Sequence, residues 1–532
     1  MQGTQVFRAP WPAAGHRLAP RLRSQARHNS RHRPPLPQAT PTNSSSSSSS
    51  SLPAITASAD PQESAVLDQL RRILDPDFDT DVVACGFVKA LDVTPDGTAS
   101  ITLELTTPAC PVKEVFRTQT EEYVGSLDFI NKVDLTITSQ PVDANNANLP
   151  EARPGGLARV KHVIAVSSCK GGVGKSTTSV NLAYTLAQMG ARVGLFDADI
   201  YGPSLPTMVS PENPVLVMDP ETKAITPTEY LGVKLVSFGF AGQGSAIMRG
   251  AMVSGVVEQL LVTSEWGELD YLVLDFPPGT GDIQLTLCQA VAIDAAVVVT
   301  TPQKLAFIDV AKGVRMFAKL QVPCVAVAEN MAYFTAPDTG NVYEPFGRGS
   351  GERIQNDFGV PHLVRFPITE DLSAAGDGGN PLVCSQPNGD VAKKYGELGA
   401  HVVREIARAD ARGAKTTVTW VPEARALEVR VPDEVPYWLD AATVRRNDTS
   451  ATSVNEWTGQ RVEMEIPDDA APESLAPLGN YAVQITWEDG FNQVATHELL
   501  ESLPRLPEDE LQERRMFVVT GGGEVAVAPA LD

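Results

Sequence analysis

The sequence predicts an α/β protein, in which a central domain with a mostly parallel sheet lies between a small α+β domain and a small, mostly β domain. Three observations lead to this prediction. Apolar runs alternate with helical segments over residues 157–410, as expected for parallel strands covered on both faces. Shorter, alternating strands flank this region on both sides. The length of 532 residues is too great for a single core.

Residues 1–59 have the composition of an organelle transit peptide. They contain seven Arg, three His and no Asp or Glu, together with a serine run from Ser44 to Ser51. A disordered tail without a targeting signal is the alternative. The Ser and Pro content favours the chloroplast stroma as destination, with the mitochondrion as the second choice.

The rest of the chain is strongly acidic. It carries a formal charge of −29, because the whole chain carries −22 and the first 59 residues carry +7. This charge argues against nonspecific binding to nucleic acid. No apolar run approaches the length of a membrane span, so stable membrane insertion is not expected. The six cysteines include no CxxC pair and fit a reducing compartment.

The first domain is expected over residues 61–142, in the order αββαβ. ESAVLDQLRRIL has helical spacing, and the strand-like runs VVACGFVKALDV and ASITLELTT are separated by the turn sequence TPDGT. A second helix is predicted over about 112–124, followed by a strand at VDLTITSQ. A polar linker, residues 143–156, separates this domain from the next.

The central domain is expected over residues 157–410. Its predicted strands are VIAVSS, RVGLFDAD, YLVLDFPP, AAVVVTTP, CVAVAENM and HLVRFP. In sheets of this kind, ligands bind at the carboxyl ends of the strands. Residues 415–503 form the predicted mostly β domain, and residues 504–532 form a predicted mobile tail.

The segment CKGGVGKS, residues 169–176, fits the P-loop spacing, with Cys169 in place of the first Gly. It follows a predicted strand and opens a predicted helix, so that backbone N–H groups at the helix N-terminus would surround phosphate. Lys175 would reach the β- and γ-phosphates, and the Ser176 hydroxyl would bind Mg²⁺. The residues expected to bind nucleotide here are Gly171, Gly172, Val173, Gly174, Lys175, Ser176 and Thr177.

Two carboxylate motifs complete the predicted nucleotide site. Asp197 and Asp199 end a strand in LFDADIYGPS. Asp275 ends the buried strand of YLVLDFPP, where an ionised carboxylate is costly without a cation, so that Mg²⁺ held through a water is its expected partner. The following residues, 279–282, are expected to form a switch loop that senses the γ-phosphate.

Lys170 is a second lysine early in the loop, and it resembles the signature of the deviant P-loop ATPases, which include MinD, ParA and the Mrp/ApbC proteins. The resemblance implies that ATP is the nucleotide and that Lys170 reaches the partner's nucleotide across a homodimer interface. It also implies that Asp199 orients the attacking water and that Asn330 contacts adenine. A solvated loop lysine is the alternative for Lys170.

Three stretches, DADIYGPSLP, WGELDYLVLDFPPGTGD and ENMAYF, resemble the Mrp/ApbC iron–sulfur carriers. The first domain is similar to a small iron–sulfur assembly domain, and the last to the module ahead of γ-butyrobetaine hydroxylases. This order resembles chloroplast members of the family. It implies a [4Fe-4S] cluster received from upstream donors and passed to apo-proteins, photosystem I among them. A metal-free switch of the MinD/ParA kind is the rival interpretation.

The cluster ligands are the point at which this sequence departs from the family. Relatives carry CxxC shortly after the ENM strand, whereas Ala336 and Thr339 stand at those positions here. Cys110, in TPACPVKEVF, is the best substitute, because a helix beginning at Pro111 would favour its thiolate. It also matches the reactive cysteine of the assembly-domain family. Cys384 is a second, weaker candidate. An inert, buried thiol is the alternative for each.

The other cysteines are expected to have structural roles. Three of them lie within strand or helix patterns and are interpreted as core residues: Cys85, Cys288 and Cys324. Cys169 is interpreted as a small residue that replaces the first Gly of the loop.

Overall fold

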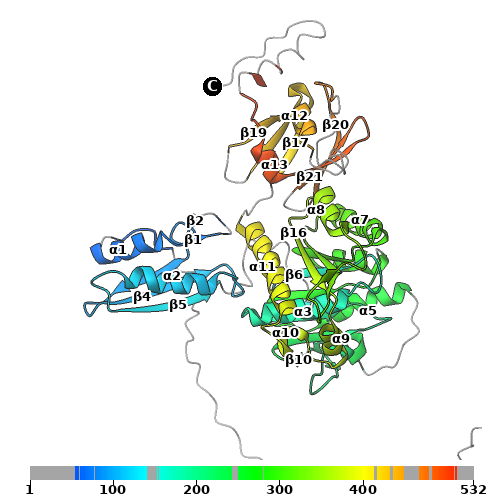
Figure 1. Ribbon diagram of the computed structural model, residues 1–532, viewed down its shortest axis with the longest axis horizontal. Helices are drawn as coiled ribbons and strands as arrows, with labels where there is room; N and C mark the ends of the chain where they lie inside the picture. Colours follow the sequence, from blue (N-terminus) through cyan, green and yellow to red (C-terminus); the bar gives the residue numbers. More distant parts are fainter. Residues whose placement is uncertain are drawn as a thin grey trace, which may run out of the picture. The chain divides into compact units, whose positions relative to one another are not determined.

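The structure is a computed structural model that describes residues 54–58, 60–76, 78, 80–140, 153, 155–241, 250–279, 281–411, 416–431, 435–448, 466–478, 482–507, 510–511 and 514. Figure 1 shows three folded units along the chain. Residues 1–53 of the predicted transit peptide and residues 515–532 of the predicted tail lie outside the described residues. The backbone N–H of Ile55 donates to Val88 O, so ordered packing of the first unit begins before Pro61.

The first unit has the predicted αββαβ order, with two short strands added. Its elements are α1 (Pro61–Leu70), β1 (Leu74–Asp75), β2 (Thr80–Asp81), β3 (Val88–Val93), β4 (Thr98–Leu105), α2 (Lys113–Gly125) and β5 (Lys132–Ser139). β3 and β4 form the predicted hairpin, and β5 pairs with β4 in parallel after the crossover through α2. Every second residue of β4 is buried, and together with apolar residues of both helices they form one core.

One expected strand is shorter than predicted. Residues 82–86 of the run VVACGFVKALDV form a turn, and only Val88–Val93 are extended. The Asp81 carboxylate accepts hydrogen bonds from the backbone N–H groups of Val83 and Ala84, and Gly86 adopts a left-handed φ of 72°. An aspartate that caps a turn has overridden the β preference of the apolar residues behind it.

The central unit is a nine-stranded sheet, parallel except at β10 and β15. Its strands are β6 (Val160–Ser167), β7 (Val193–Asp197), β10 (Thr228–Tyr230), β11 (Val233–Ser237), β12 (Leu269–Asp275), β13 (Ala295–Thr300), β14 (Cys324–Thr335), β15 (Val342–Tyr343) and β16 (His362–Pro367). The order is β10-β11-β7-β12-β6-β13-β14-β15, and β16 pairs with β14. All six strands predicted from the sequence are present.

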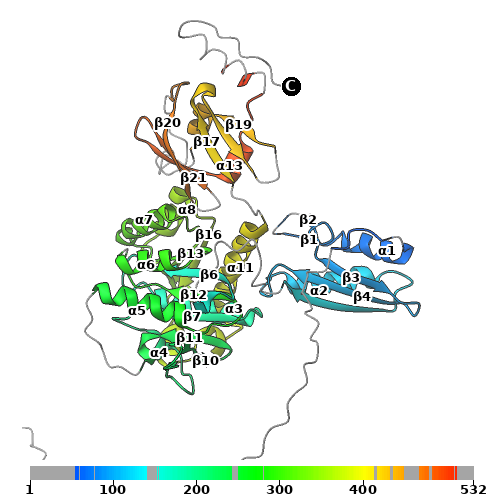
Figure 2. The ribbon, with the colours of Figure 1, turned by 180° about the vertical axis from the view of Figure 1, so that it is seen from behind.

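Helices cover both faces of this sheet (Figure 1, Figure 2). The main ones are α3 (Lys175–Gln188), α5 (Gly250–Thr263), α6 (Asp282–Ala290), α7 (Lys304–Lys319), α8 (Ser350–Phe358) and α11 (Asp390–Ala411). Shorter elements are η1 (Gly155–Leu157), α4 (Leu205–Met208), β8 (Val217–Met218), β9 (Ile225–Thr226), η2 (Phe238–Phe240), α9 (Glu370–Asp377) and α10 (Leu382–Ser385). The helices α3 and α11 share one apolar core with the sheet, and α5 to α8 share the other. The strands read as continuous apolar runs because both faces are buried.

Arg153, at the end of the predicted linker, belongs structurally to the central unit. Its side chain is buried, and its Nη2 lies 2.6 Å from Asp294 Oδ2. Its Nη1 donates to the carbonyl oxygens of Val160 and Lys161 at the start of β6. A buried ion pair with additional hydrogen bonds fixes the entry of the chain into the sheet.

The third unit is mostly β, as predicted. Its elements are β17 (Thr417–Val421), η3 (Pro422–Ala424), β18 (Ala426–Arg430), β19 (Tyr437–Asp440), α12 (Ala441–Arg446), β20 (Pro472–Leu478), β21 (Ala482–Trp487), β22 (Asn492–Thr496) and α13 (His497–Ser502). Two three-stranded antiparallel sheets enclose a shared core around Trp487. The backbone N–H of Leu506 donates to Trp438 O and Leu511 is buried, so packing extends past the expected boundary at residue 503.

A search of the described residues for membrane spans finds none: no helix among them is both long and apolar enough to cross a bilayer.

His401 of α11 stacks on His362 of β16, with ring centroids 4.0 Å apart. Burial, reinforced by the neighbouring His362, lowers the pKa of His401 to about 4. The unfolded imidazole binds a proton near pH 6.5, whereas the folded one binds it only near pH 4. This residue therefore stabilises the fold above pH 6.5, and that contribution is lost as the pH falls from 6.5 towards 4.

We predict that His401→Gln makes the free energy of unfolding less dependent on pH. Between about pH 7.5 and pH 5 the wild-type chain should lose about 1 kcal/mol more than the variant, a value that allows for the solvent reaching this partly exposed ring. Urea unfolding of both chains at both pH values measures the difference. Equal pH dependence of the two chains would show that the ring titrates normally.

Candidate nucleotide site and cysteine positions

The predicted P-loop lies between the end of β6 and the start of α3, at the carboxyl end of a central strand. The helix begins at Lys175, and its N-cap Gly174 has a left-handed φ of 87°. Gly172 also has a positive φ, of 78°. These two glycines allow the loop to turn its backbone N–H groups towards one point, which is the geometry that holds phosphate at a helix N-terminus.

Lys175 is buried and makes two polar contacts at the head of the loop. Its Nζ lies 2.5 Å from Asp275 Oδ1 and 3.0 Å from Ser176 Oγ. Only 7% of the lysine and 4% of the aspartate are exposed, so each charge depends on the other. The sheet order explains the encounter, because Asp275 ends β12 and β12 is the direct neighbour of β6.

Asp197 ends β7 and lies beside Asp275 in register on the adjacent strand. Burial, together with the charge of Asp275, raises the pKa of the Asp197 carboxyl to about 7. Its oxygens accept hydrogen bonds from the backbone N–H groups of Asp199, Ser204 and Leu205 at 3.1–3.2 Å. Asp197 therefore anchors the loop in which Asp199 stands.

Asp199, the expected water-orienting residue, lies in that loop and is partly buried. Its Oδ1 accepts the backbone N–H of Gly202 at 3.1 Å. Because the loop is fixed by Asp197 and by this turn, the Asp199 carboxylate is held at the carboxyl edge of the sheet, where the phosphate loop also lies.

Three buried polar residues of this site were missed by sequence reasoning: Ser179, Ser237 and Gln284. The Ser179 hydroxyl contacts Asp275, and the Ser237 hydroxyl donates to Asp197 Oδ2. Gln284 Nε2 donates to the carbonyl oxygens of Pro277 and Gly279, and so supports the expected switch loop. Serine and glutamine in a helix or strand give no pattern in a single sequence, so no available signal marked them.

Asn330 lies at the P-loop, although its contact differs in kind from the one expected. Its Nδ2 donates to the carbonyl oxygen of Val173 at 2.9 Å, and its Oδ1 accepts the backbone N–H of Met331. The neighbouring Glu329 is buried, accepts the backbone N–H of Gly351 and pairs with Arg365 Nε at 2.9 Å. The middle of β14 is thus bonded to the phosphate loop through Asn330, while an adenine contact of Asn330 stays a prediction.

Lys170 and Thr177 lie at the two ends of the loop region, and both are partly exposed. Among the residues that the structure describes, no salt bridge involves Lys170. Its ammonium is therefore not paired with a carboxylate in the part of the chain that the structure describes. Thr177 follows Ser176 in the first turn of α3.

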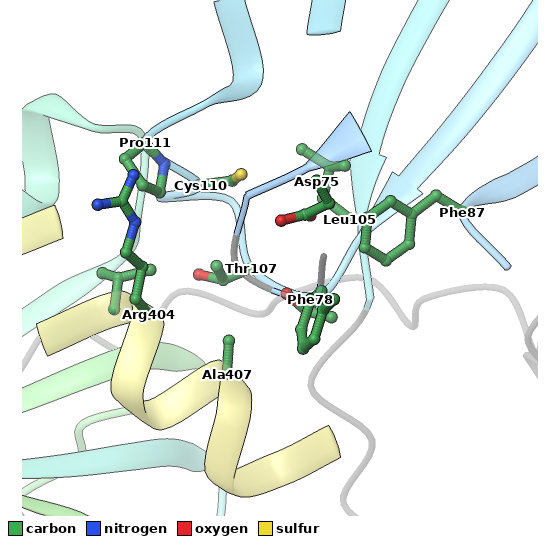
Figure 3. A pocket seen from close by; sticks show the side chains of 11 residues that line it. Asp75, Phe78, Phe87, Leu105, Thr107, Cys110, Pro111, Arg404 and Ala407 are labelled. Carbon is green, nitrogen blue, oxygen red and sulfur yellow. The ribbon is translucent and has the colours of Figure 1, made fainter. Parts of the chain in front are cut away.

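Cys110 lies in the turn before α2. The helix begins at Lys113 with Val112 as its N-cap, so Pro111 does not open it and Cys110 lies near the helix without capping it. A cavity of about 10 Å³ adjoins the thiol, with Asp75, Phe78 and Thr107 among its lining residues (Figure 3). This volume suits a single water and is too small for a cluster.

Cys384 lies in α10 and packs against the core of the central unit. Its thiol is contacted by Gln188 Nε2 at 3.7 Å, and burial raises its pKa. No described contact joins it to Cys110. The structure therefore places the two candidate cysteines at separate positions and gives Cys384 an environment that favours the neutral thiol.

The remaining cysteines are packed, as expected. Burial raises the pKa of Cys85 and of Cys169 to about 11, raises that of Cys288 to about 12, and also raises that of Cys324. Within the described ranges, no group of three or more His, Cys, Asp or Glu side chains is arranged to hold a metal ion.

The segment where relatives are expected to carry CxxC is a hairpin between β14 and β15. Ala336 and Thr339 stand in its turn, which is closed by hydrogen bonds from Ala336 N to Asn341 O and from Gly340 N to Ala336 O. Neither residue offers sulfur, so this hairpin contributes no cysteine ligand.

Comparison with known proteins assigns each unit to a family. The profile of the NUBPL iron-transfer P-loop NTPase matches residues 159–403, and an iron–sulfur cluster assembly protein profile matches residues 63–135. The N-terminal part of γ-butyrobetaine hydroxylase-like proteins matches residues 419–499. The "Fe-S cluster assembly factor HCF101, chloroplastic" of Oryza sativa subsp. japonica is 58% identical over 85% of this chain and 84% of its own length. The chain belongs to the Mrp/ApbC family of P-loop iron–sulfur cluster carriers.

Other proteins are similar to a smaller share of this chain. The "Iron-sulfur cluster carrier protein" of Synechocystis is 40% identical over 65% of this chain and 98% of its own length. Among solved structures, a nucleotide-binding protein from Archaeoglobus fulgidus in complex with ADP is 34% identical, with a TM-score of 0.39, over 44% of this chain and 93% of that one.

Gly174→Ala is predicted to destabilise the nucleotide-free chain. A Cβ at this position would lie 2.1 Å from Asn330 Nδ2, and the φ of 87° is unfavourable for alanine. We expect a loss of about 2 kcal/mol in the free energy of unfolding. Gly171→Ala is the matched control, because its Cβ would meet no atom within 4 Å. Thermal or urea unfolding measures both, and equal stabilities would contradict the contact with Asn330.

Proposed function

We propose that this chain is an ATP-dependent scaffold and carrier that binds a [4Fe-4S] cluster and transfers it to apo-proteins in the chloroplast stroma, in support of photosystem I assembly. The observation that carries the proposal is the buried contact of Lys175 with Ser176 and Asp275 at the head of a P-loop. Its relative in Oryza sativa is named as a chloroplastic Fe-S cluster assembly factor, which supports both the cargo and the location.

Each side chain of the site has a separate role in phosphoryl transfer. Lys175 turns from Asp275 to the β- and γ-phosphates. The movement is short because Asp275 and the phosphates would both lie next to the Lys175 ammonium. Asp199 orients the attacking water from the loop that Asp197 anchors. Gly171 to Thr177 hold the phosphate groups through backbone N–H donors and the hydroxyls at the helix start.

The donor set fits Mg²⁺. Ser176 Oγ and Asp275 Oδ1 both lie within 3.0 Å of Lys175 Nζ, so a hydroxyl and a carboxylate face one small volume. Oxygen donors of this kind are the ligands that Mg²⁺ prefers. When bound, the ion supplies charge neutralisation at the phosphates. Ser176 would hold the ion through its hydroxyl, and Asp275 would accept hydrogen bonds from water around it.

Lys170 acts on the nucleotide of a second copy of the chain, so the working form is a homodimer. The support is its position at the outer end of the loop and its lack of an ion pair among the described residues. A cation delivered in trans stabilises the charge of the phosphoryl-transfer transition state, as an arginine finger does.

We predict that Lys170→Ala lowers ATP hydrolysis at least about 100-fold and changes nucleotide affinity only a few-fold. Mixing this variant with Asp199→Ala, which is itself inactive, should restore about a quarter of the wild-type rate. Half of the dimers are then mixed, and each mixed dimer has one complete site. Phosphate release measures the rates. Absence of recovery on mixing would show that Lys170 acts within its own chain.

The cluster is cargo, and Cys110 is its first protein ligand in this proposal, with Cys384 as the second candidate. Cys110 lies in a turn and is partly exposed, whereas the pKa of the Cys384 thiol is raised by burial. A [4Fe-4S] cluster needs four ligands. Two copies of Cys110 in a dimer supply part of that set, and donor or acceptor proteins supply the rest during transfer.

Anaerobic reconstitution of the chain with iron and sulfide tests the cargo. The wild-type chain should give the Mössbauer signature of [4Fe-4S], and Cys110→Ser should lose at least half of the bound iron, because the ligand set is then incomplete. Cys85→Ser is the matched control, since this thiol is also partly buried in the first unit and packs against the same core, and burial raises its pKa to about 11.

Each outcome decides between interpretations. A cluster that survives in Cys110→Ser keeps the carrier and moves the search to Cys384→Ser. Failure of the wild-type chain to bind iron, with ATP hydrolysis intact, would overturn the carrier function and favour a metal-free ATPase switch.

A further inference from the structure

Ser179 lies in the second turn of α3 and is fully buried. Its Oγ is 2.7 Å from Asp275 Oδ1 and 3.1 Å from the carbonyl oxygen of Lys175, one helical turn earlier. A serine inside a helix commonly donates to the carbonyl four residues before it. Here a carboxylate is closer than that carbonyl.

The Ser179 hydroxyl has one proton to donate, and two oxygens lie within hydrogen-bond distance. They are the carbonyl oxygen of Lys175 and Oδ1 of Asp275. The carboxylate is the shorter contact and carries a charge, and hydrogen bonds to ionised acceptors are about twice as strong as neutral ones. We therefore assign the hydroxyl proton of Ser179 to a hydrogen bond with Asp275 Oδ1. The carbonyl of Lys175 keeps its normal role in the helix.

Among the described residues, both side-chain donors to Asp275 contact the same carboxylate oxygen. Lys175 Nζ and Ser179 Oγ contact Oδ1, and within the described residues no hydrogen bond reaches Oδ2. When Lys175 turns to phosphate, Ser179 is the donor that stays on Oδ1. Without it, a carboxylate that is only 4% exposed would keep neither its orientation nor a partner on that oxygen.

We propose that Ser179 is a positioning residue that fixes the Asp275 carboxylate, and through it the Mg²⁺ requirement of the nucleotide site. This inference rests on the proposed ATPase function. Because Ser179 contacts Oδ1, it leaves Oδ2 without a hydrogen bond among the described residues, so that Oδ2 is the oxygen that would accept from water around the ion. Ser179 touches neither nucleotide nor ion, and acts only through Asp275.

Three variants of the full-length chain test this role. Ser179→Ala removes the hydroxyl, and alanine favours the helix, so the fold is retained. Ser179→Thr keeps the hydroxyl and should restore the wild-type behaviour. Thr185→Val is the matched control: the Thr185 hydroxyl is also buried on α3 and also donates to a carbonyl four residues earlier, that of Asn181, but it contacts no carboxylate.

The first measurement is binding of a fluorescent ATP analogue as a function of Mg²⁺ concentration. We expect Ser179→Ala to need about tenfold more Mg²⁺ for half-maximal binding of the analogue. This factor corresponds to the lower end of the free-energy range for losing a hydrogen bond to a charged group. Its affinity for the analogue in EDTA should equal that of wild type, since no phosphate contact is lost. Thr185→Val should match wild type in both.

An equal Mg²⁺ requirement in Ser179→Ala and Thr185→Val would overturn the proposal. If wild type itself bound no nucleotide, the proposed function would fail instead. The two failures are distinguishable, because wild type and Thr185→Val still bind the analogue in the first case and bind none in the second.

Discussion

The buried contact between the Lys175 ammonium and the Asp275 carboxylate is the constraint on which the nucleotide site depends. An isolated charge in this position would cost several kcal/mol, so the two groups must meet. They meet only if β12 lies beside β6 and both strands end at the same level. The continuous apolar strands and the two helical layers make that arrangement possible, because they bury the sheet on both faces and fix its register.

Asp197 shows what happens to the carboxylate that has no cation. Asp197 lies in register with Asp275, yet of these two carboxyl groups only Asp275 has a described ion pair with the Lys175 ammonium, and the pKa of Asp197 is raised by burial and by the charge of Asp275. Backbone N–H groups and the Ser237 hydroxyl partly compensate for its charge. The same N–H groups belong to the loop that carries Asp199. One buried carboxyl group thus anchors the loop that carries Asp199.

Much of this arrangement could be predicted from the sequence. The order of strands and helices, the P-loop and the strand-ending carboxylates follow from apolar periodicity and from motifs whose spacing has a mechanical reason. The turn at residues 82–86 could not be predicted, since Asp81 caps it through contacts that apolar periodicity does not report. Ser179 and Gln284 were missed for the same reason: their roles depend on which strand end lies opposite them, and a single sequence does not state that.

The cysteines differ from the nucleotide site in that the described residues do not bring them together into one site. Five of the six thiols are held neutral by burial, and the hairpin at Ala336 and Thr339 carries no sulfur. The side chains of the nucleotide site are therefore paired with one another, whereas the cluster site proposed above has one candidate thiol in a turn, Cys110. A complete set of four internal thiolates would hold a cluster too firmly to release it. A carrier with an incomplete set depends on its donor and acceptor for the other ligands, so transfer becomes an exchange of ligands without a stable closed state.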